Sequence, residues 1–147
     1  MNIARSKQNV LRYGPAAVMT AVISALSLAP AHFFHGVESA LPHISGLDKM
    51  VHALMYAALT ASYLHAVPQP RRRSLKAVLW IVLGAAIYGI VMELCQKWLT
   101  TTRCMDPRDA LANAVGALTY ALFACAWARP QADRTKTLAQ DLPDSDT

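Results

Sequence analysis

Charged side chains are scarce in this chain. Only 16% of its 147 residues are Asp, Glu, Lys or Arg, whereas 54% are hydrophobic. A soluble domain usually has about a quarter of its residues charged, because charged side chains cover its surface. The shortage argues against a water-soluble globular protein and for apolar surroundings around much of the chain. The length allows one domain.

Cysteine is scarce as well, and nucleophile motifs are missing. The chain has three cysteines, and no serine or cysteine stands in a nucleophile motif, which argues against acyl-enzyme chemistry. Spacing alone does not pair Cys95 with Cys104, because a disulfide requires their Cβ atoms to meet. We therefore expect both to be free thiols. The sequence has no internal repeat.

Long apolar runs are what the chain does contain. They cover residues 13–31, 50–67, 77–92 and 110–128. A membrane-spanning helix needs about 20 mainly apolar residues. The second and fourth runs reach that length, and the first and third need flanking residues. Since backbone polar groups must be paired in lipid, we expect all four to be helices. The predicted fold is an all-α, polytopic membrane bundle of four transmembrane helices.

The first run has an alternative interpretation as a cleaved signal peptide. Arg5, Lys7 and Arg12 precede a short apolar core, and Ala29-Pro30-Ala31 has the small residues of a cleavage site. We prefer a retained helix, because three spans would place the two termini on opposite sides of the membrane. The distribution of basic residues disagrees with that placement.

Basic residues predict the orientation. Lys and Arg near membrane helices favour the cytoplasmic side. Ten of the fourteen lie in three segments that four spans put on one side, and both termini are therefore predicted to be cytoplasmic. These ten are Arg5, Lys7, Arg12, Arg71, Arg72, Arg73, Lys76, Arg129, Arg134 and Lys136. The net charge of +5 follows from this topology and implies no nucleic-acid partner.

The domain boundaries follow from the same pattern. We expect a cytoplasmic N-terminal segment over residues 1–12, the membrane domain over residues 13–128, and a tail over residues 129–147. The tail has acids and few large apolar residues, which predicts disorder. Small residues inside the apolar runs, including Gly84, Gly89 and Gly116, are predicted to be positions of close helix packing.

Polar residues collect at the outer ends of three predicted helices. They recur within each helix at spacings of three or four, which puts them on one helix face. At a rise of about 1.5 Å per residue, His52 lies roughly 6 Å inside Asp48. Ionisable groups at such a depth usually face the bundle interior and pair with one another. The predicted binding residues, which share one polar cavity on the outer side, are Asp48, Lys49, His52, Glu93, Gln96, Arg103, Asp106, Asp109 and Asn113.

Three short motifs at these helix ends resemble the VanZ-like family of small bacterial membrane proteins. In order they read Asp48-Lys49-Met-Val-His52, Glu93-Leu-Cys-Gln96, and Arg103-Cys-Met-Asp106-Pro-Arg-Asp109-Ala-Leu-Ala-Asn113-Ala-Val-Gly116. The resemblance covers roughly residues 45–125. One departure is Thr100-Thr101-Thr102, where many relatives have a Pro-Gly turn before the arginine. The resemblance implies a multi-helix membrane protein and a link to teicoplanin resistance, but no reaction.

We favour binding of a polar or lipid headgroup by these residues. Arg103 has the planar fork that grips a phosphate or carboxylate, while His52, Gln96 and Asn113 would contact hydroxyl or amide groups. The partners would be membrane lipids and an envelope lipid or a glycopeptide-related ligand. Neither a cofactor nor an oligomeric state follows from the sequence.

Two alternatives stay open. In the first, the protein is a membrane-embedded enzyme in which His52, Glu93 and Asp109 are the catalytic candidates, with a His/carboxylate pair as general base. The same three residues could instead hold a divalent metal, although the sequence alone assigns none. In the second, the polar residues at the helix ends form a structural belt without a ligand. Its carboxylates are neutralised by Lys49, Lys97, Arg103 and Arg108, while Asn113 joins two helices.

Overall fold

The chain is almost entirely helical. A computed structural model describes residues 3–34, 46–68, 71, 74–100 and 105–140. It contains α1 (Ile3–Leu28), the 3-10 turn η1 (Ala31–Phe34), α3 (Leu47–Ala66), α4 (Leu75–Leu99) and α5 (Pro107–Gln140). The described residues include no strand. The predicted all-α class is confirmed for this part of the chain.

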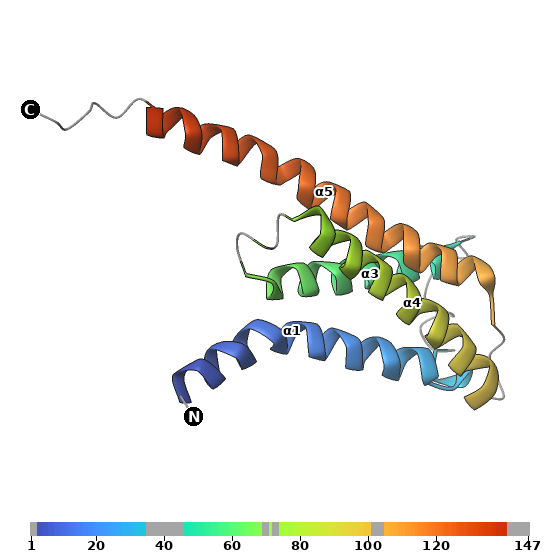
Figure 1. Ribbon diagram of the computed structural model, residues 1–147. Helices are drawn as coiled ribbons and strands as arrows, with labels where there is room; N and C mark the ends of the chain where they lie inside the picture. Colours follow the sequence, from blue (N-terminus) through green and yellow to red (C-terminus); the bar gives the residue numbers. More distant parts are fainter. Residues whose placement is uncertain (1–2, 35–45, 69–70, 72–73, 101–104, 141–147) are drawn as a thin grey trace, which may run out of the picture.

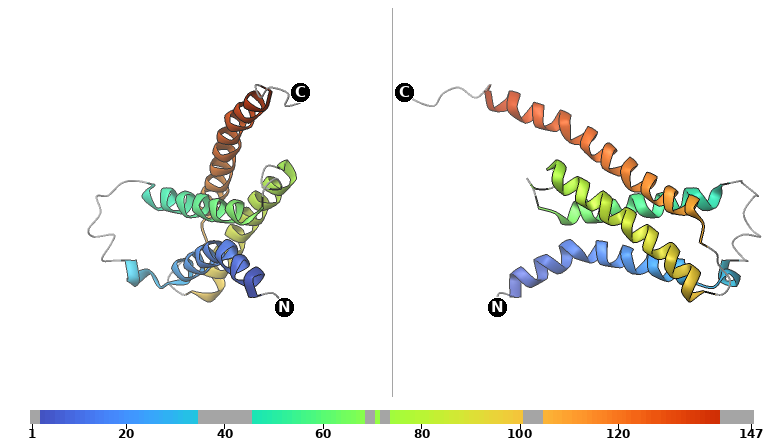
Figure 2. Two further views of the ribbon diagram at one scale, coloured as in Figure 1. Left: turned by 90° about the vertical axis from the view of Figure 1, so that its left-hand side faces the viewer. Right: turned by 45° about the vertical axis from the view of Figure 1, so that its right-hand side comes forward.

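The four long helices run in alternating directions, so that α1 begins and α5 ends at the same end of the bundle (Figure 1). The end of α3 and the start of α4 lie at that end too, whereas the start of α3, the end of α4 and the start of α5 lie at the other end (Figures 1 and 2). Helices α3 and α4 each pack against all three other long helices. The polar motifs of three helices therefore meet at one end.

Three of the helices are long and apolar enough to cross a membrane. The candidate segments are Asn9–Leu28, Leu75–Leu99 and Pro107–Trp127. Helix α3 has 20 residues but is not among them. Polar side chains such as His52, Thr60 and Ser62 lie along it. The structure thus supports a membrane protein with three apolar spans, and α3, the more polar helix, packs against all of them.

The outer surface of the bundle carries large apolar side chains. On α4, Trp80, Leu83 and Ile87 are exposed, and Leu111 and Leu122 are exposed on α5. Soluble monomers rarely expose contiguous apolar surface on this scale. The interior is packed by residues from all four helices, which are Ile23, Tyr56, Leu59, Ala85 and Ala117. Such a surface fits lipid as the surrounding medium.

Several predicted boundaries differ from the observed helices. The third apolar run extends into flanking residues, as the sequence required, because α4 has 25 residues and includes Glu93 and Gln96, whose side chains are buried. Helix α1 begins at Ile3, ahead of the boundary at residue 12. Helix α5 continues to Gln140. Residues 129–140 of the tail, which were predicted to be disordered, are helical, although they include Pro130.

Hydroxyl groups attach α1 to its neighbours, a feature that the sequence analysis missed. The Tyr88 hydroxyl donates to the Thr20 carbonyl oxygen at 3.0 Å and lies 2.7 Å from the Ser24 hydroxyl. The Tyr63 hydroxyl lies 3.2 Å from the Thr20 hydroxyl. Hydrogen bonds between helices of this kind hold membrane bundles together. The only signal in the sequence is the presence of hydroxyl residues within apolar runs.

Glycines set how closely the helices approach. A methyl group at Gly116 would overlap the Ala53 carbonyl oxygen, so the backbones of α3 and α5 are in direct contact there. At Gly89 an added carbon would lie 3.0 Å from the Asn113 side chain and 3.2 Å from Tyr56. The predicted packing role is confirmed for both. It is wrong for Gly84, which is exposed and has nothing within 4 Å.

Candidate functional site

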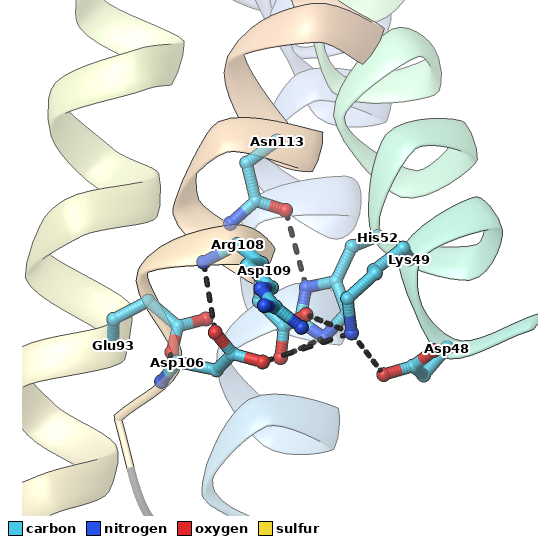
Figure 3. Close-up of polar contacts among 8 residues, drawn as sticks. All are labelled: Asp48, Lys49, His52, Glu93, Asp106, Arg108, Asp109 and Asn113. Carbon is cyan, nitrogen blue, oxygen red and sulfur yellow. Dashed lines mark hydrogen bonds and ion pairs between the residues drawn. The ribbon is translucent and has the colours of Figure 1, made fainter. Parts of the chain in front are cut away.

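Seven of the nine predicted binding residues lie together at one end of the bundle. They come from the first turns of α3, the end of α4 and the start of α5 (Figure 3). We refer to Asp48, Lys49, His52, Glu93, Asp106, Asp109 and Asn113 as the polar cluster. Gln96 is buried one turn beyond Glu93 on α4. Arg103, the predicted anion-binding residue, lies outside the described residues.

A hydrogen bond between helices orients the imidazole of His52. Its Nδ1 lies 3.1 Å from Oδ1 of the buried Asn113 (Figure 3). An amide oxygen can only accept, so Nδ1 carries the proton and donates. In the neutral ring this leaves the lone pair on Nε2, which faces Asp109 Oδ2 at 3.9 Å. The pair fixes the tautomer in which Nε2 is free to act as a base or ligand.

Glu93 is the most deeply buried charged side chain of the cluster. It is 1% exposed, and its Oε2 accepts the Asp106 backbone N–H at 3.3 Å. That bond ties the end of α4 to the entry of α5. Within the described residues Glu93 makes no ion pair. A buried carboxylate with one long hydrogen bond is costly, because burial of a charge without a partner is strongly unfavourable.

Asp109 sits between two cationic or basic groups. Its Oδ2 faces His52 Nε2, and its Oδ1 forms an ion pair with Lys49 Nζ at 3.4 Å. The geometry of that pair does not make a hydrogen bond, so Oδ1 is buried without one. Asp109 also lies in the first turn of α5, where the helix dipole favours a negative charge. It is therefore better compensated than Glu93.

Lys49 and Asp48 form the exposed rim of the cluster. Lys49 Nζ donates to Asp48 Oδ2 at 2.8 Å and lies 3.6 Å from Asp106 Oδ2. The hydrogen bond from Lys49 lowers the pKa of Asp48 below its ordinary value. The Asp48 side chain is nevertheless 59% exposed. Its pairing contributes little, because water screens surface ion pairs.

Asp106 shapes the start of α5. Its Oδ1 accepts the Arg108 backbone N–H at 2.9 Å, and Pro107 is the first helical residue. This is an N-cap followed by proline, a combination that stabilises helix starts. The cap fixes the turn of α5 that carries Asp109. Asp106, one of the predicted binding residues, therefore has a structural role.

The charges of the cluster do not balance within the described residues. Four carboxylates (Asp48, Glu93, Asp106 and Asp109) face one ammonium, that of Lys49. The structural alternative required Lys97, Arg103 and Arg108 as further partners, and of these Lys97 and Arg108 lie within the described residues. In the described part of the chain neither side chain makes an ion pair, and both are exposed. The bond from His52 to Asn113 does join two helices, as that alternative expected.

Three groups of the cluster have the composition and spacing of a metal-ligand set. His52, Glu93 and Asp109 each offer one ligand atom, and these atoms lie within 4.8 Å of one another. Each residue comes from a different helix. Cys95 and Cys125 are free thiols, as expected for Cys95, and Cys104 lies outside the described residues. The arrangement can hold a cation or remove a proton, and the seven residues of the polar cluster include no serine or cysteine.

Comparison with protein-family models, curated protein sequences and solved structures finds no match to this chain.

Proposed function

We propose that the protein is a VanZ-like integral membrane protein that binds a polar or lipid headgroup at the outer face of a bacterial inner membrane. The observation that carries this proposal is the polar cluster. Side chains of three separate helices converge at one end of a bundle whose outer surface is apolar. A headgroup in the outer leaflet would lie at the level of such a cluster.

Four spans with both termini in the cytoplasm are part of the proposal. The ten clustered basic residues fit one membrane face, and α1 begins where α5 ends (Figure 1). Helix α3 would be the fourth span, because α1, α4 and α5 pack against it and reduce its contact with lipid. The polar cluster then faces outward.

The charge of the cluster indicates the chemistry of the ligand. Four carboxylates and one ammonium favour a group that brings hydrogen-bond donors, such as hydroxyl or amino groups. Arg103 would supply the contact to a phosphate or carboxylate. A lipid-linked envelope intermediate combines both kinds of group, and its recognition would connect the protein with the cell-envelope or glycopeptide response implied by the VanZ-like resemblance.

Native mass spectrometry of the full chain in detergent tests this function. Wild type should retain a lipid adduct that His52→Ala loses. His65→Ala is the matched control, because His65 lies on the same helix but is exposed and bonded to the Ala61 carbonyl oxygen at 2.8 Å. Identical adducts in all three proteins would contradict a headgroup site. Loss of stability without loss of an adduct in His52→Ala would favour the structural belt.

The orientation has its own test. A single cysteine at position 134, in a chain whose three cysteines are replaced, should react with a membrane-impermeant maleimide only after the cells are opened. Labelling in intact cells would show that the C-terminal end of α5 is outside, which would overturn the proposed topology. The outward position of the polar cluster would fall with it.

An enzyme acting on an envelope lipid is the second candidate. It is favoured by the tautomer of His52, whose Nε2 is free to accept a proton from water or a lipid hydroxyl. If the protein is an enzyme, His52→Gln should keep the lipid adduct. Unlike wild type, it should form no product when it is incubated with lipid extracts. If product formation does not change, His52 is not the base.

A further inference from the structure

The two carboxyl groups among the three ligand-bearing residues of the polar cluster are incompletely satisfied by the described residues. Glu93 is 1% exposed, and its one hydrogen bond in the described chain is the 3.3 Å bond from the Asp106 N–H. Asp109 Oδ1 is buried without a hydrogen bond. The buried side chain of Glu93 and the partly buried side chain of Asp109 thus lie beside the imidazole of His52. A positive charge between them would offset the cost of their burial.

Helix polarity makes Glu93 the least compensated of these groups. Asp48 and Asp109 occupy the first turns of α3 and α5, where the positive ends of the helix dipoles stabilise carboxylates. Glu93 lies in the last two turns of α4, which is the negative end. The nearest basic residue on α4, Lys97, is exposed and makes no ion pair in the described chain. The need for a cation is therefore greatest at Glu93.

His52 is already oriented as a metal ligand. Metal-bound histidines usually donate their second ring N–H to a carbonyl or carboxylate, which fixes the ring and leaves the other nitrogen for the metal. Here Nδ1 donates to Asn113 Oδ1, and Nε2 faces the carboxylate of Asp109 at 3.9 Å. Asn113 in turn is 1% exposed and packs against Gly89. The support is rigid because helix packing holds it.

We propose that His52 Nε2 and the carboxylates of Glu93 and Asp109 bind a divalent transition metal ion, such as zinc, that joins α3, α4 and α5. The ligand set is one nitrogen and two carboxylates, which suits zinc and neighbouring ions better than magnesium or calcium. Three protein ligands leave a coordination position open for water or for an oxygen of a bound molecule. This site does not depend on the headgroup proposal.

Metal binding requires the three ligand atoms to move closer together. Zinc bonds of about 2.0–2.1 Å place neighbouring ligand atoms about 3–3.5 Å apart. The three atoms now lie within 4.8 Å, so the side chains must approach by about 1–2 Å. Rotation of the Glu93 and Asp109 carboxyl groups can supply this movement. The helices need not shift.

Lys49 competes with the metal for Asp109. Its ammonium lies 3.4 Å from Asp109 Oδ1, but it also pairs with Asp48 and Asp106 and is partly exposed. It can therefore leave Asp109 and keep two acidic partners. Removal of its charge should strengthen metal binding, whereas removal of a ligand should weaken it. These opposite directions distinguish a defined site from general attraction to histidine or acidic surface.

The experiment uses the full chain in detergent after treatment with a chelator and delipidation. Zinc chloride is titrated in a calorimeter, and the bound metal is counted by elemental analysis. Wild type should bind one zinc ion per chain. Glu93→Gln and His52→Ala should each weaken binding at least tenfold, and Lys49→Met should strengthen it about tenfold. His65→Ala is the control and should bind as wild type does. Circular dichroism checks that each variant has kept its helices.

Two results would overturn the proposal. One is the absence of stoichiometric zinc in wild type, and the other is equal affinity in wild type and Glu93→Gln. If a variant that lacks one of the metal ligands does not fold, the spectrum of cobalt bound to the wild-type chain is measured instead. A bound cobalt ion of low coordination number should give intense visible absorption bands. The weak spectrum of the hydrated ion would contradict the site. A lipid adduct that persists without zinc would leave headgroup binding intact and show that the two functions are separate.

Discussion

The two halves of the helix bundle are held together by different kinds of contact. At one end, His52, Glu93, Asp109 and Asn113 bury polar groups between α3, α4 and α5. At the other end, Leu64, Val78 and Ala121 make an apolar contact between the same three helices. Both halves are closely packed, but among the described residues only the first buries a charged side chain, that of Glu93. The difference indicates that stability alone does not explain the polar end, since the apolar half shows how these helices pack without it.

The boundary between the halves is the close contact of α3 and α5. Gly116 touches the Ala53 backbone, one turn beyond Asn113 along α5. This contact brings His52 on α3 within reach of Asn113 and Asp109 on α5. The polar cluster therefore depends on a packing contact that is itself apolar.

Gly116→Ala should cause the largest loss of unfolding free energy, because it acts at the contact between the two halves. An added methyl group would overlap the Ala53 carbonyl oxygen and lie 2.6 Å from its carbon, and a backbone carbonyl cannot move aside cheaply. We expect a loss of about 3 kcal/mol in unfolding free energy, measured by SDS titration in detergent micelles. Gly84→Ala, with nothing within 4 Å, should be neutral or up to about 1 kcal/mol more stable. Equal effects of the two would refute direct contact between α3 and α5.

Leu64→Ala tests the apolar half. Leu64 is buried against Val78 and Ala121, so truncation leaves a cavity and should cost about 2 kcal/mol in the same titration. Leu122→Ala on the exposed face of α5 should change stability by less than about 0.5 kcal/mol. Metal and lipid binding should survive in Leu64→Ala. Loss of binding there would mean that the halves are coupled more strongly than their separation suggests.

Asn113→Ala tests the polar half by removing the group that orients His52. It leaves the Nδ1–H of the partly buried His52 without its acceptor, and we expect a cost of about 1–2 kcal/mol. Thr119→Ala on the same helix is the control, because its hydroxyl is exposed and bonds only to the Val115 carbonyl oxygen at 2.8 Å. Unlike Leu64→Ala, the Asn113 variant should also reduce zinc affinity. A stability loss with unchanged affinity would remove Asn113 from the support of His52.

Asp48→Asn should have the smallest effect, although it changes a charge at the polar end. Asp48 is mostly exposed, so its pair with Lys49 should contribute no more than about 0.5 kcal/mol. Its pKa is lowered in the folded state by the Lys49 hydrogen bond. The contribution is therefore present at neutral pH and lost as pH falls below the ordinary value near 3.8. Comparison of wild type and variant at pH 7 and pH 3 measures it, and a larger difference at pH 3 would contradict the assignment.

The sequence predicted the helices of this protein because apolar runs and backbone hydrogen bonding act locally. It also placed the polar residues on three helix ends, since a helical repeat fixes which residues share a face. Composition separates apolar from polar segments, but it does not give the end of a helix, because α5 continues beyond its apolar run and through Pro130 to Gln140.

The partners within the polar cluster were decided by tertiary structure. Nothing in the spacing of Lys49 shows that it reaches Asp48, Asp106 and Asp109 together, or that Lys97 points away. The sequence proposed His52, Glu93 and Asp109 as one group. Their approach to within 4.8 Å depends on the crossing of α3 and α5 at Gly116. A local repeat can give each side chain its face, but only the packing of helices distant in sequence sets the distances between those faces.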